Sequence, residues 1–258
     1  MSSQHNLVML AGDHPSTYVI YNFLQTAGMK PRVLILEQPP GKIRLLARRA
    51  KRIGAVTALG QGLFVALAAP ILRLEARGRI RTIIRENDLD LTPPPSRFIE
   101  RVSSVNAPQT IGVLREIQPK VVVVNATRII SRTVLECVPA TFINMHAGIT
   151  PAYRGVHGAY WALVNSDPQG CGVTVHLVDP GIDSGPIISQ ARIHPTPQDN
   201  FASYPWLQLA AGLPLLKNAV QAALNDQLQT STPTGPSKLW YHPSLWEYLL
   251  VRLRRGIR

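Results

Sequence analysis

The chain has 258 residues, of which 45% are hydrophobic, and it carries a formal net charge of +12. The hydrophobic fraction excludes an intrinsically disordered chain, and the length suits one large α/β domain, or one domain with an extension. The charge favours an anionic partner such as nucleic acid, a phosphorylated substrate or acidic lipid.

The chain begins with no basic region followed by a long apolar run, so we expect no secretory signal and a cytoplasmic protein. The two cysteines, Cys137 and Cys171, are far apart and form no C-x-x-C pair. They are therefore predicted to be free thiols in a reducing compartment.

Short apolar runs and helical patterns alternate along the chain. The runs predict strands at residues 6–11, 32–36, 121–124, 140–145, 172–177 and 186–193. Helices are predicted between them, at residues 16–27, 107–117, 131–137 and 158–165. This alternation predicts an α/β fold: an open, mostly parallel, twisted sheet flanked by helices, Rossmann-like in type.

A basic segment, Gly41–Asn87, interrupts this rhythm and reads as a helical insertion. Its middle, Ile53–Leu72, holds no charged residue and approaches the ~20 apolar residues of a membrane span. A span would separate the first two strands from the rest of the sheet, so it is disfavoured. A soluble helical insertion, or a hairpin whose basic flanks meet an anionic membrane surface, remain as alternatives.

The tail after Ile193 contains two further helical patterns, at residues 205–224 and 243–254. We therefore expect an α/β domain at residues 1–195, interrupted by the insertion at about 41–90. A helical C-terminal extension would follow at residues 196–258.

Residues suited to acyl transfer lie at the end of a predicted strand and about forty residues later. Asn144 and His146 are two apart on an extended segment, so their side chains face the same way. Asp183 follows within Gly181–Gly185. An amide can stabilise a tetrahedral oxyanion, an imidazole can move a proton, and a carboxylate can orient the imidazole. No G-x-G-x-x-G follows the first strand, which disfavours a dinucleotide-dependent dehydrogenase.

The blocks NMHAGITPAYRG and GVTVHLVDPGIDSG resemble the catalytic core of the folate-dependent formyltransferases, over roughly residues 119–193. The resemblance implies transfer of a formyl group from 10-formyltetrahydrofolate to a primary amine, without a metal. It places the catalytic triad on Asn144, His146 and Asp183. His146 is followed by Ala147 and Gly148 where the family usually has Pro and Ser, so the adjoining loop is expected to differ.

The same resemblance implies two further sets of site residues. The cofactor contacts would be Arg128, Ile129, Ile130, Val178, Asp179 and Gly181. The acceptor contacts would be Gly12, Ser16, Tyr153, Arg154, Gly155 and His157. A structural role for His157 stays open, and a structural role is expected for His176.

The acceptor amine is left open among three families of substrate. The loop after the first strand lacks the Gly-Ser-Asn of glycinamide ribonucleotide enzymes, and Asp13 there would oppose a phosphate. Methionyl-tRNA enzymes carry a larger C-terminal domain, which argues against tRNA, although the positive charge favours it. We therefore expect a small anionic acceptor such as a nucleotide-linked amino sugar. A non-catalytic membrane- or RNA-associated protein on the same core is the alternative of another class.

Overall fold

The computed structural model describes residues 6–39 and 54–258 of the chain. The strands are β1 (Leu7–Gly12), β2 (Val33–Glu37), β3 (Ile99–Val102), β4 (Val121–Asn125), β5 (Thr141–His146), β6 (Arg154–Gly155), β7 (Gly172–Leu177), β8 (Ile187–Arg192) and β9 (Leu239–Trp240). The α-helices are α1 (Pro15–Thr26), α3 (Ala55–Leu63), α4 (Ala69–Glu75), α5 (Arg77–Glu86), α6 (Pro108–Ile117), α7 (Arg132–Leu135), α8 (Gly158–Val164), α9 (Tyr204–Leu224) and α10 (Leu245–Arg255). A π-helical turn, η1 (Phe64–Ala68), joins α3 to α4, and 3-10 turns form η2 (Ser96–Phe98) and η3 (Pro168–Gly170).

Seven strands form one sheet in the order β3-β2-β1-β4-β5-β7-β8. The pairs from β3 to β5 are parallel, and β7 and β8 are antiparallel to their neighbours. β4 is buried along its whole length, as expected for a strand covered on both faces. The predicted class, a mostly parallel sheet between helices, is confirmed.

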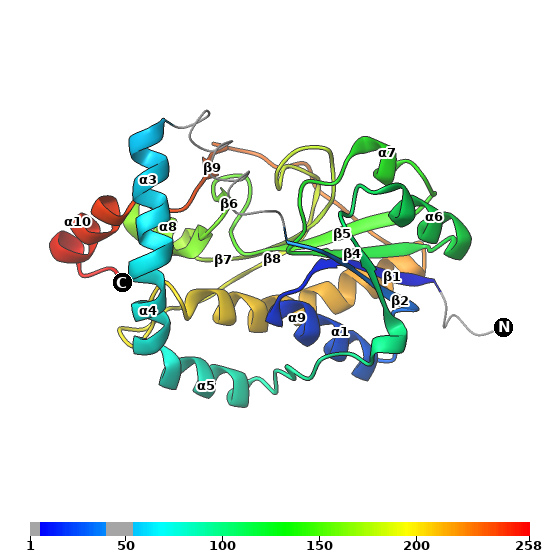
Figure 1. The fold of residues 1–258 in the computed structure, drawn as a ribbon, viewed down its shortest axis with the longest axis horizontal. Helices are drawn as coiled ribbons and strands as arrows, with labels where there is room; N and C mark the ends of the chain where they lie inside the picture. The colour runs from blue at the N-terminus through cyan, green and yellow to red at the C-terminus, as the bar shows by residue number, and fades with distance from the viewer. Residues whose placement is uncertain (1–5, 40–53) are drawn as a thin grey trace.

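Helices cover both faces of this sheet (Figure 1). α1 and α9 lie on one face, where their apolar side chains share one cluster with β1, β2, β4 and β5. α6 and α7 lie on the other, in a second cluster. α9 contains Pro214 within its span. The predicted division at residue 195 stays a prediction, but α9, from the tail, contributes directly to the core of the sheet.

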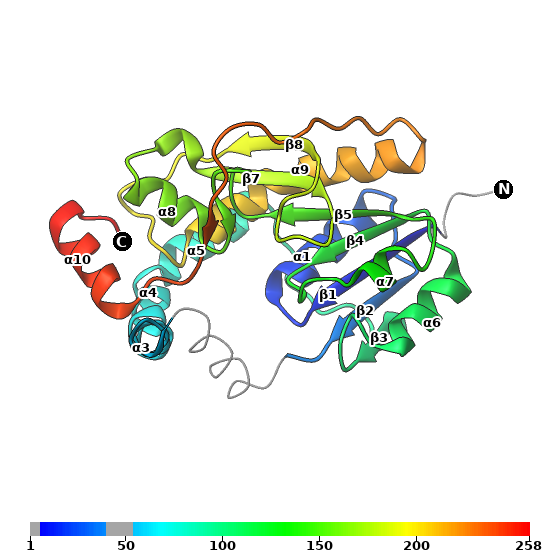
Figure 2. The same cartoon turned by 90° about the horizontal axis from the view of Figure 1, so that it is seen from above.

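The described part of the insertion, residues 54–87, is helical as predicted. Residues 41–53 of that prediction lie outside the described residues. The helical run α3–η1–α4 packs with α8 and α10 in a cluster that includes Phe64, Leu72, Tyr160, Phe201 and Tyr248. Figure 2 places these helices at the end of the molecule opposite the N-terminus.

Three strands were not predicted from the sequence. β3 is an edge strand in which Glu100 and Arg101 interrupt the apolar pattern. β6 and β9 are two residues each and pair with one another, aligning Arg154 with Leu239 and Gly155 with Trp240. This small pairing matters for the site because it brings the C-terminal tail beside the segment that follows β5.

Candidate active site

A cavity of about 570 Å³ opens where β4 and β5 end. Carboxyl ends of parallel strands are where open α/β folds bind ligands. The lining comes from several parts of the chain: the segment after β4, the end of β5, the loop after β7, the start of α9, and β9. The lining residues on which the site depends are Arg128–Ile130, Asn144, His146, His176, Val178–Asp183 except Pro180, and Leu239–Tyr241.

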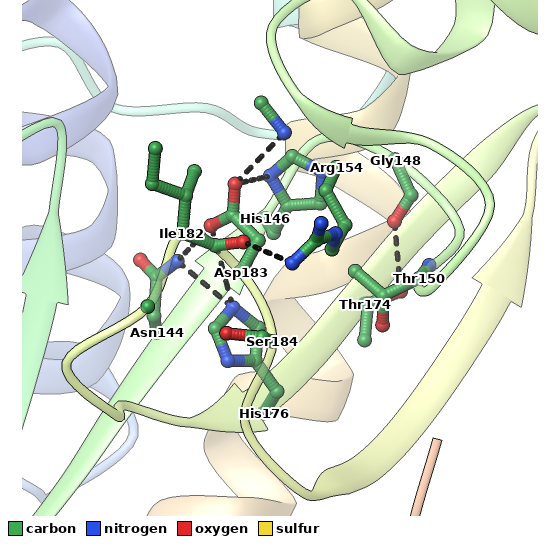
Figure 3. Close-up of polar contacts among 12 residues, drawn as sticks. Asn144, His146, Gly148, Thr150, Arg154, Thr174, His176, Ile182, Asp183 and Ser184 are labelled. Atoms are coloured by element: carbon green, nitrogen blue, oxygen red, sulfur yellow. Dashed lines mark hydrogen bonds and ion pairs between the residues drawn. The ribbon is translucent and has the colours of Figure 1, made fainter. Parts of the chain in front are cut away.

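Asp183 is the centre of a polar cluster in this cavity (Figure 3). One carboxylate oxygen, Oδ2, lies 3.3 Å from Nδ1 of His146 and accepts a hydrogen bond of 3.0 Å from the backbone N–H of Gly155. The other, Oδ1, lies 3.4 Å from Nδ2 of Asn144 and 3.6 Å from Nε2 of His176. The structure therefore brings together the three side chains that the sequence predicts as a triad, and adds a second imidazole.

The backbone around Asp183 fixes this geometry. Asp183 has a φ of 49°, in the left-handed region that aspartate tolerates better than most residues. The preceding carbonyl, of Ile182, accepts a hydrogen bond of 3.3 Å from Arg154. Asp179 accepts from the N–H of Gly181 and from the hydroxyl of Ser184, which closes the loop on itself. The conformation of this loop, together with the side-chain rotamer, thus fixes the position of the Asp183 carboxylate.

His146 is buried, and both of its ring nitrogens have partners. Nε2 lies 2.8 Å from the carbonyl oxygen of Tyr153, so this nitrogen carries a proton and donates it. Nδ1 then faces the Asp183 carboxylate and is the nitrogen whose protonation can change. Burial lowers the pKa of His146 below its ordinary value, and the Asp183 charge and the Tyr153 carbonyl oppose that fall.

The pKa of Asp183 is lowered overall, although burial alone would raise it. Attraction to His146 in its protonated form, the contact with the His176 ring and the N–H of Gly155 outweigh the burial. A carboxylate that stays ionised beside a neutral imidazole can attract a proton onto that imidazole. The His146–Asp183 pair therefore has the electrostatics of a proton acceptor.

His176 lies within the cavity, which the sequence did not indicate. Its Nδ1 donates to the Leu177 carbonyl at 2.8 Å, so Nε2 is an acceptor and receives a hydrogen bond of 3.1 Å from Nδ2 of Asn144. The antiparallel register that aligns Asn144 with His176 explains the contact. The expectation of a purely structural role does not account for this placement, since His176 orients the amide of Asn144.

All six predicted cofactor contacts line the cavity: Arg128, Ile129, Ile130, Val178, Asp179 and Gly181. Arg128 is held in place by Glu37, whose carboxylate accepts from the Arg128 backbone N–H at 2.6 Å and lies 3.3 Å from its Nε. The segment after β4 and the loop after β7 thus both reach the cavity that contains the triad.

The predicted acceptor contacts divide into two groups. Gly155 and His157 line the cavity. Gly12, Ser16, Tyr153 and Arg154 are not among the lining residues, and their contact with an acceptor stays a prediction. Ser16 instead contacts the ring of His14 and accepts from Asn125. Tyr153 is buried: its ring stacks on Trp240, and its hydroxyl donates to Asp167.

His157 has a mixed environment. It has a φ of 59°, its Nε2 lies 3.0 Å from Nδ1 of His242, and its ring lies 4.0 Å from that of Phe201, centroid to centroid. Burial lowers its pKa well below the ordinary value, and His242 adds to this effect. His157 is therefore neutral near pH 7, and it both lines the cavity and packs into the helical cluster behind it.

Sequence reasoning missed the start of α9 and two further parts of the cavity wall. The side chain of His14 caps the N-terminus of α1 and lines the cavity. Histidine is not among the preferred capping residues, so this role was not predicted. Leu239, Trp240 and Tyr241 come from the tail and depend on the pairing of β9 with β6. At Gly155 a Cβ atom would lie 2.3 Å from the Trp240 carbonyl oxygen, so the glycine permits this close approach. Strands of two residues are too short to show an alternating hydrophobic pattern in the sequence, so this pairing could not be predicted.

Comparison with known proteins places the chain in a family. A model of the formyl transferase family matches residues 72–205, just over half of the sequence. The chain belongs to this family. Among curated relatives, the methionyl-tRNA formyltransferase of Kosmotoga olearia is 30% identical over 158 residues, which cover 60% of this chain and 50% of that protein. That of Chloroflexus aggregans is 36% identical over 115 residues, covering 41% and 37%. The chain thus spans half or less of the length of these relatives.

Solved structures share the fold at low sequence identity. Glycinamide ribonucleotide transformylase 1 from Symbiobacterium toebii has a TM-score of 0.58 at 16% identity, covering 93% of this chain and 96% of that one. The N-formyltransferase from Helicobacter canadensis, solved with folinic acid and dTDP-3-aminofucose, has a TM-score of 0.55 at 17% identity, covering 91% and 70%. Within the described residues, no group of three or more His, Cys, Asp or Glu side chains is placed to hold a metal ion.

Proposed function

We propose that this protein transfers a formyl group from 10-formyltetrahydrofolate to a primary amine, with Asn144, His146 and Asp183 as its catalytic residues. The observation that carries the proposal is the position of the Asp183 carboxylate, 3.3 Å from the His146 ring and 3.4 Å from the Asn144 amide, inside the one cavity described at the strand ends.

The arrangement supports a stepwise transfer. The amine nitrogen attacks the formyl carbon, a C–N bond forms, and the carbonyl oxygen becomes an oxyanion. His146 takes the proton released from the nitrogen on Nδ1, and Asp183 stabilises the resulting imidazolium. The His146 imidazolium then returns this proton to the folate nitrogen, the oxyanion reforms the carbonyl as the bond between the formyl carbon and that nitrogen breaks, and tetrahydrofolate leaves.

Asn144 is the proposed oxyanion donor. In the resting geometry its amide nitrogen is directed at both Asp183 and His176. Donation to the substrate therefore requires the N–H directed at His176 to turn toward the oxyanion.

Two observations support folate as the donor. The six residues expected to contact it line the cavity that contains the triad. The Helicobacter canadensis N-formyltransferase, which shares the fold, was solved with folinic acid. We infer that the segment Arg128–Ile130 and the loop Val178–Ile182 hold the pterin.

We propose a small anionic acceptor such as a nucleotide-linked amino sugar. The net charge of +12 and the dTDP-3-aminofucose found with the Helicobacter canadensis neighbour support it. Methionyl-tRNA is the second candidate, because the curated relatives are methionyl-tRNA formyltransferases and a basic protein suits nucleic acid. Glycinamide ribonucleotide is the third, on fold alone.

The proposed location is the cytoplasm, with membrane contact through the basic insertion at residues 41–87. The helical run Ala55–Glu75 is long and apolar enough to cross a membrane. About a third (33%) of its most apolar 18-residue stretch is buried inside the protein. This contact is a proposal, separate from the chemistry of the cavity.

Purified protein, 10-formyltetrahydrofolate and a panel of amines test the proposed activity. The panel contains a nucleotide amino sugar, glycinamide ribonucleotide, hydroxyornithine and methionyl initiator tRNA. We expect tetrahydrofolate release together with a formyl mass gain on one acceptor, and loss of both in His146→Ala. Folate binding without turnover on any amine would favour the non-catalytic alternative, and no folate binding would refute the proposal.

A further inference from the structure

Exposed apolar side chains gather on two neighbouring helices at one end of the molecule. Ten of the twelve large hydrophobic side chains exposed among the described residues belong to the run α3–η1–α4 or to α10. Their exposed fractions range from 45% to 84%. We call this surface the outer face: Val56, Leu59, Val65, Leu67, Ile71 and Leu74 on the first run, and Trp246, Leu249, Leu250 and Leu253 on α10.

The opposite sides of the same helices are fixed to the protein. Phe64 and Leu72 on the first run and Tyr248 on α10 are fully buried in one cluster. Two polar contacts add to this packing. Gln61 donates to the His242 carbonyl at 2.7 Å, and Asn200 donates to the Leu72 carbonyl at 3.0 Å.

α3 and α10 also touch closely. At Gly60 a Cβ atom would lie 2.3 Å from the ring of Trp246 and 2.7 Å from Cβ of Ser244. The glycine therefore lets α10 lie directly against α3, as the two helices do in Figure 1. Two segments far apart in the sequence thus lie side by side.

This anchoring excludes a transmembrane helix. The run Ala55–Glu75 spans about 31 Å at 1.5 Å per residue, enough for a bilayer core. Crossing would strip Phe64 and Leu72 from their cluster and leave Gln61 in lipid without its partner. A helix with one side buried in protein and the other apolar and exposed suits the membrane interface instead.

Exposed arginines lie on the helices of the outer face or on the helix next to them. Arg73, Arg77 and Arg81 are exposed along α4 and α5, and Arg254 and Arg255 are exposed at the end of α10. Arg255 donates to the Val164 carbonyl and the Ser166 hydroxyl, which are uncharged, so these contacts leave its charge uncompensated.

Few carboxylates offset this charge. Glu75 pairs with Arg252, Glu86 lies 4.0 Å from Arg79, and Glu247 is used in the capping box of α10. An apolar surface with a cationic border matches an anionic lipid surface, whereas two copies of this chain would bring like charges together.

From these observations we propose that the outer face docks on the surface of an anionic lipid bilayer. Leu249, Leu253 and their neighbours enter the headgroup boundary, Trp246 lies at the interface, and the arginines contact lipid phosphates. The cavity wall Leu239–Tyr241 leads directly into α10, so docking holds the cavity close to the membrane. This inference is independent of the acceptor and of the formyl transfer itself.

Co-sedimentation with vesicles tests the docking. The full chain is mixed with vesicles of phosphatidylcholine alone, or of phosphatidylcholine with phosphatidylglycerol, at low and at high salt. We expect binding to the anionic vesicles, at least about tenfold weaker binding to the neutral ones, and partial loss at high salt. Equal binding to both vesicle types, or none to the anionic ones, overturns the proposal.

Matched variants test each component of the face. Leu59→Ser/Ile71→Ser and Leu249→Ser/Leu253→Ser each remove apolar contacts from one helix and are expected to weaken binding at least about tenfold. Arg81→Gln/Arg254→Gln is expected to weaken it by about fivefold for each arginine. The control Arg115→Gln/Arg132→Gln removes the same charge from α6 and α7, at the other end of the molecule, and is expected to bind as the wild type.

Circular dichroism shows whether each variant folds. If the serine variants do not fold, the arginine variant alone tests the docking. Wild-type binding by the arginine pair, or by a folded serine pair, overturns the docking proposal. A wild-type dimer in solution that Leu249→Ser/Leu253→Ser dissociates would assign the face to a second copy and overturn it as well.

Discussion

Replacing Asp183 by asparagine removes one charge from the centre of the site and leaves its size unchanged. The carboxylate has four neighbours: His146 Nδ1, the Gly155 N–H, Asn144 Nδ2 and His176 Nε2. A carboxamide offers one oxygen and one NH2 group in place of two oxygens. If its oxygen takes the position beside Gly155, its NH2 group faces the NH2 group of Asn144.

Rotation of the Asn144 amide does not remove the conflict. It would turn the Asn144 oxygen toward Nε2 of His176, which is an acceptor because Nδ1 donates to Leu177. Two like groups therefore face each other in either arrangement, two NH2 groups before the rotation or two acceptors after it, which costs about 1–3 kcal/mol of folding stability. The effect on catalysis is larger. Without the carboxylate the pKa of His146 falls further, and no charge stabilises its protonated form. We expect turnover to fall by about 10²–10⁴-fold, equivalent to about 3–5 kcal/mol in the barrier.

The assay compares the turnover and thermal unfolding of Asp183→Asn with those of a matched variant, Asp199→Asn. Asp199 is also buried and also has a lowered pKa, through Arg79, Thr196 and Ser203, but it does not line the cavity. Both variants should lose stability, and only Asp183→Asn should lose turnover by orders of magnitude. Equal turnover losses in the two variants, or near-normal turnover in Asp183→Asn, would refute the assigned role.

Three further outcomes are expected. His157 is neutral in the folded protein, where burial lowers its pKa, and can be protonated once the chain unfolds. Its contribution to the free energy of unfolding is therefore fully present above about pH 6.5. That contribution is lost as the pH falls further, by at most about 1.4 kcal/mol per pH unit. Urea unfolding of His157→Asn between pH 7.5 and 5.5 should therefore show a flatter pH dependence than the wild type, and an unchanged slope would contradict this. His176→Leu should lower turnover by about 10–100-fold with little change in folate affinity, measured by steady-state kinetics and calorimetry, because it releases the Asn144 amide. Gly60→Val should destabilise the protein by about 1–3 kcal/mol in thermal melts and shift Trp246 fluorescence, because its side chain would displace α10; an unaltered melt would argue against close α3–α10 packing.

The sheet could be predicted because most of its strands are uninterrupted apolar runs. Val121–Val124 is buried at every position, and β-branched residues favour that environment. β3 could not be predicted in the same way, since Ile99–Val102 lies at the edge of the sheet and includes Glu100 and Arg101. An edge strand pairs with only one other strand and is open to solvent on its other side. Charged side chains are therefore tolerated there, and they interrupt the apolar pattern that marks a strand.

The candidate site could be predicted in part for a similar reason. The two-residue spacing of Asn144 and His146 on a strand places them on one side, and the structure directs both side chains at Asp183. The surroundings of the predicted acceptor contacts could not be predicted. The Tyr153 ring stacks on Trp240, and Arg154 donates to the Ile182 carbonyl, and both partners lie far from these residues in the sequence.

His176 illustrates a limit that applies to any sheet of mixed direction. Along its own strand it alternates with buried valines, which is the pattern of any half-buried strand. Its role depends on β7 running antiparallel to β5 in a register that aligns it with Asn144. A shift of one residue would turn the imidazole to the other face of the sheet and leave the Asn144 amide without that partner. Pairing direction and register are set by long-range packing, so a residue that orients the catalytic amide becomes visible only when the two strands are seen together.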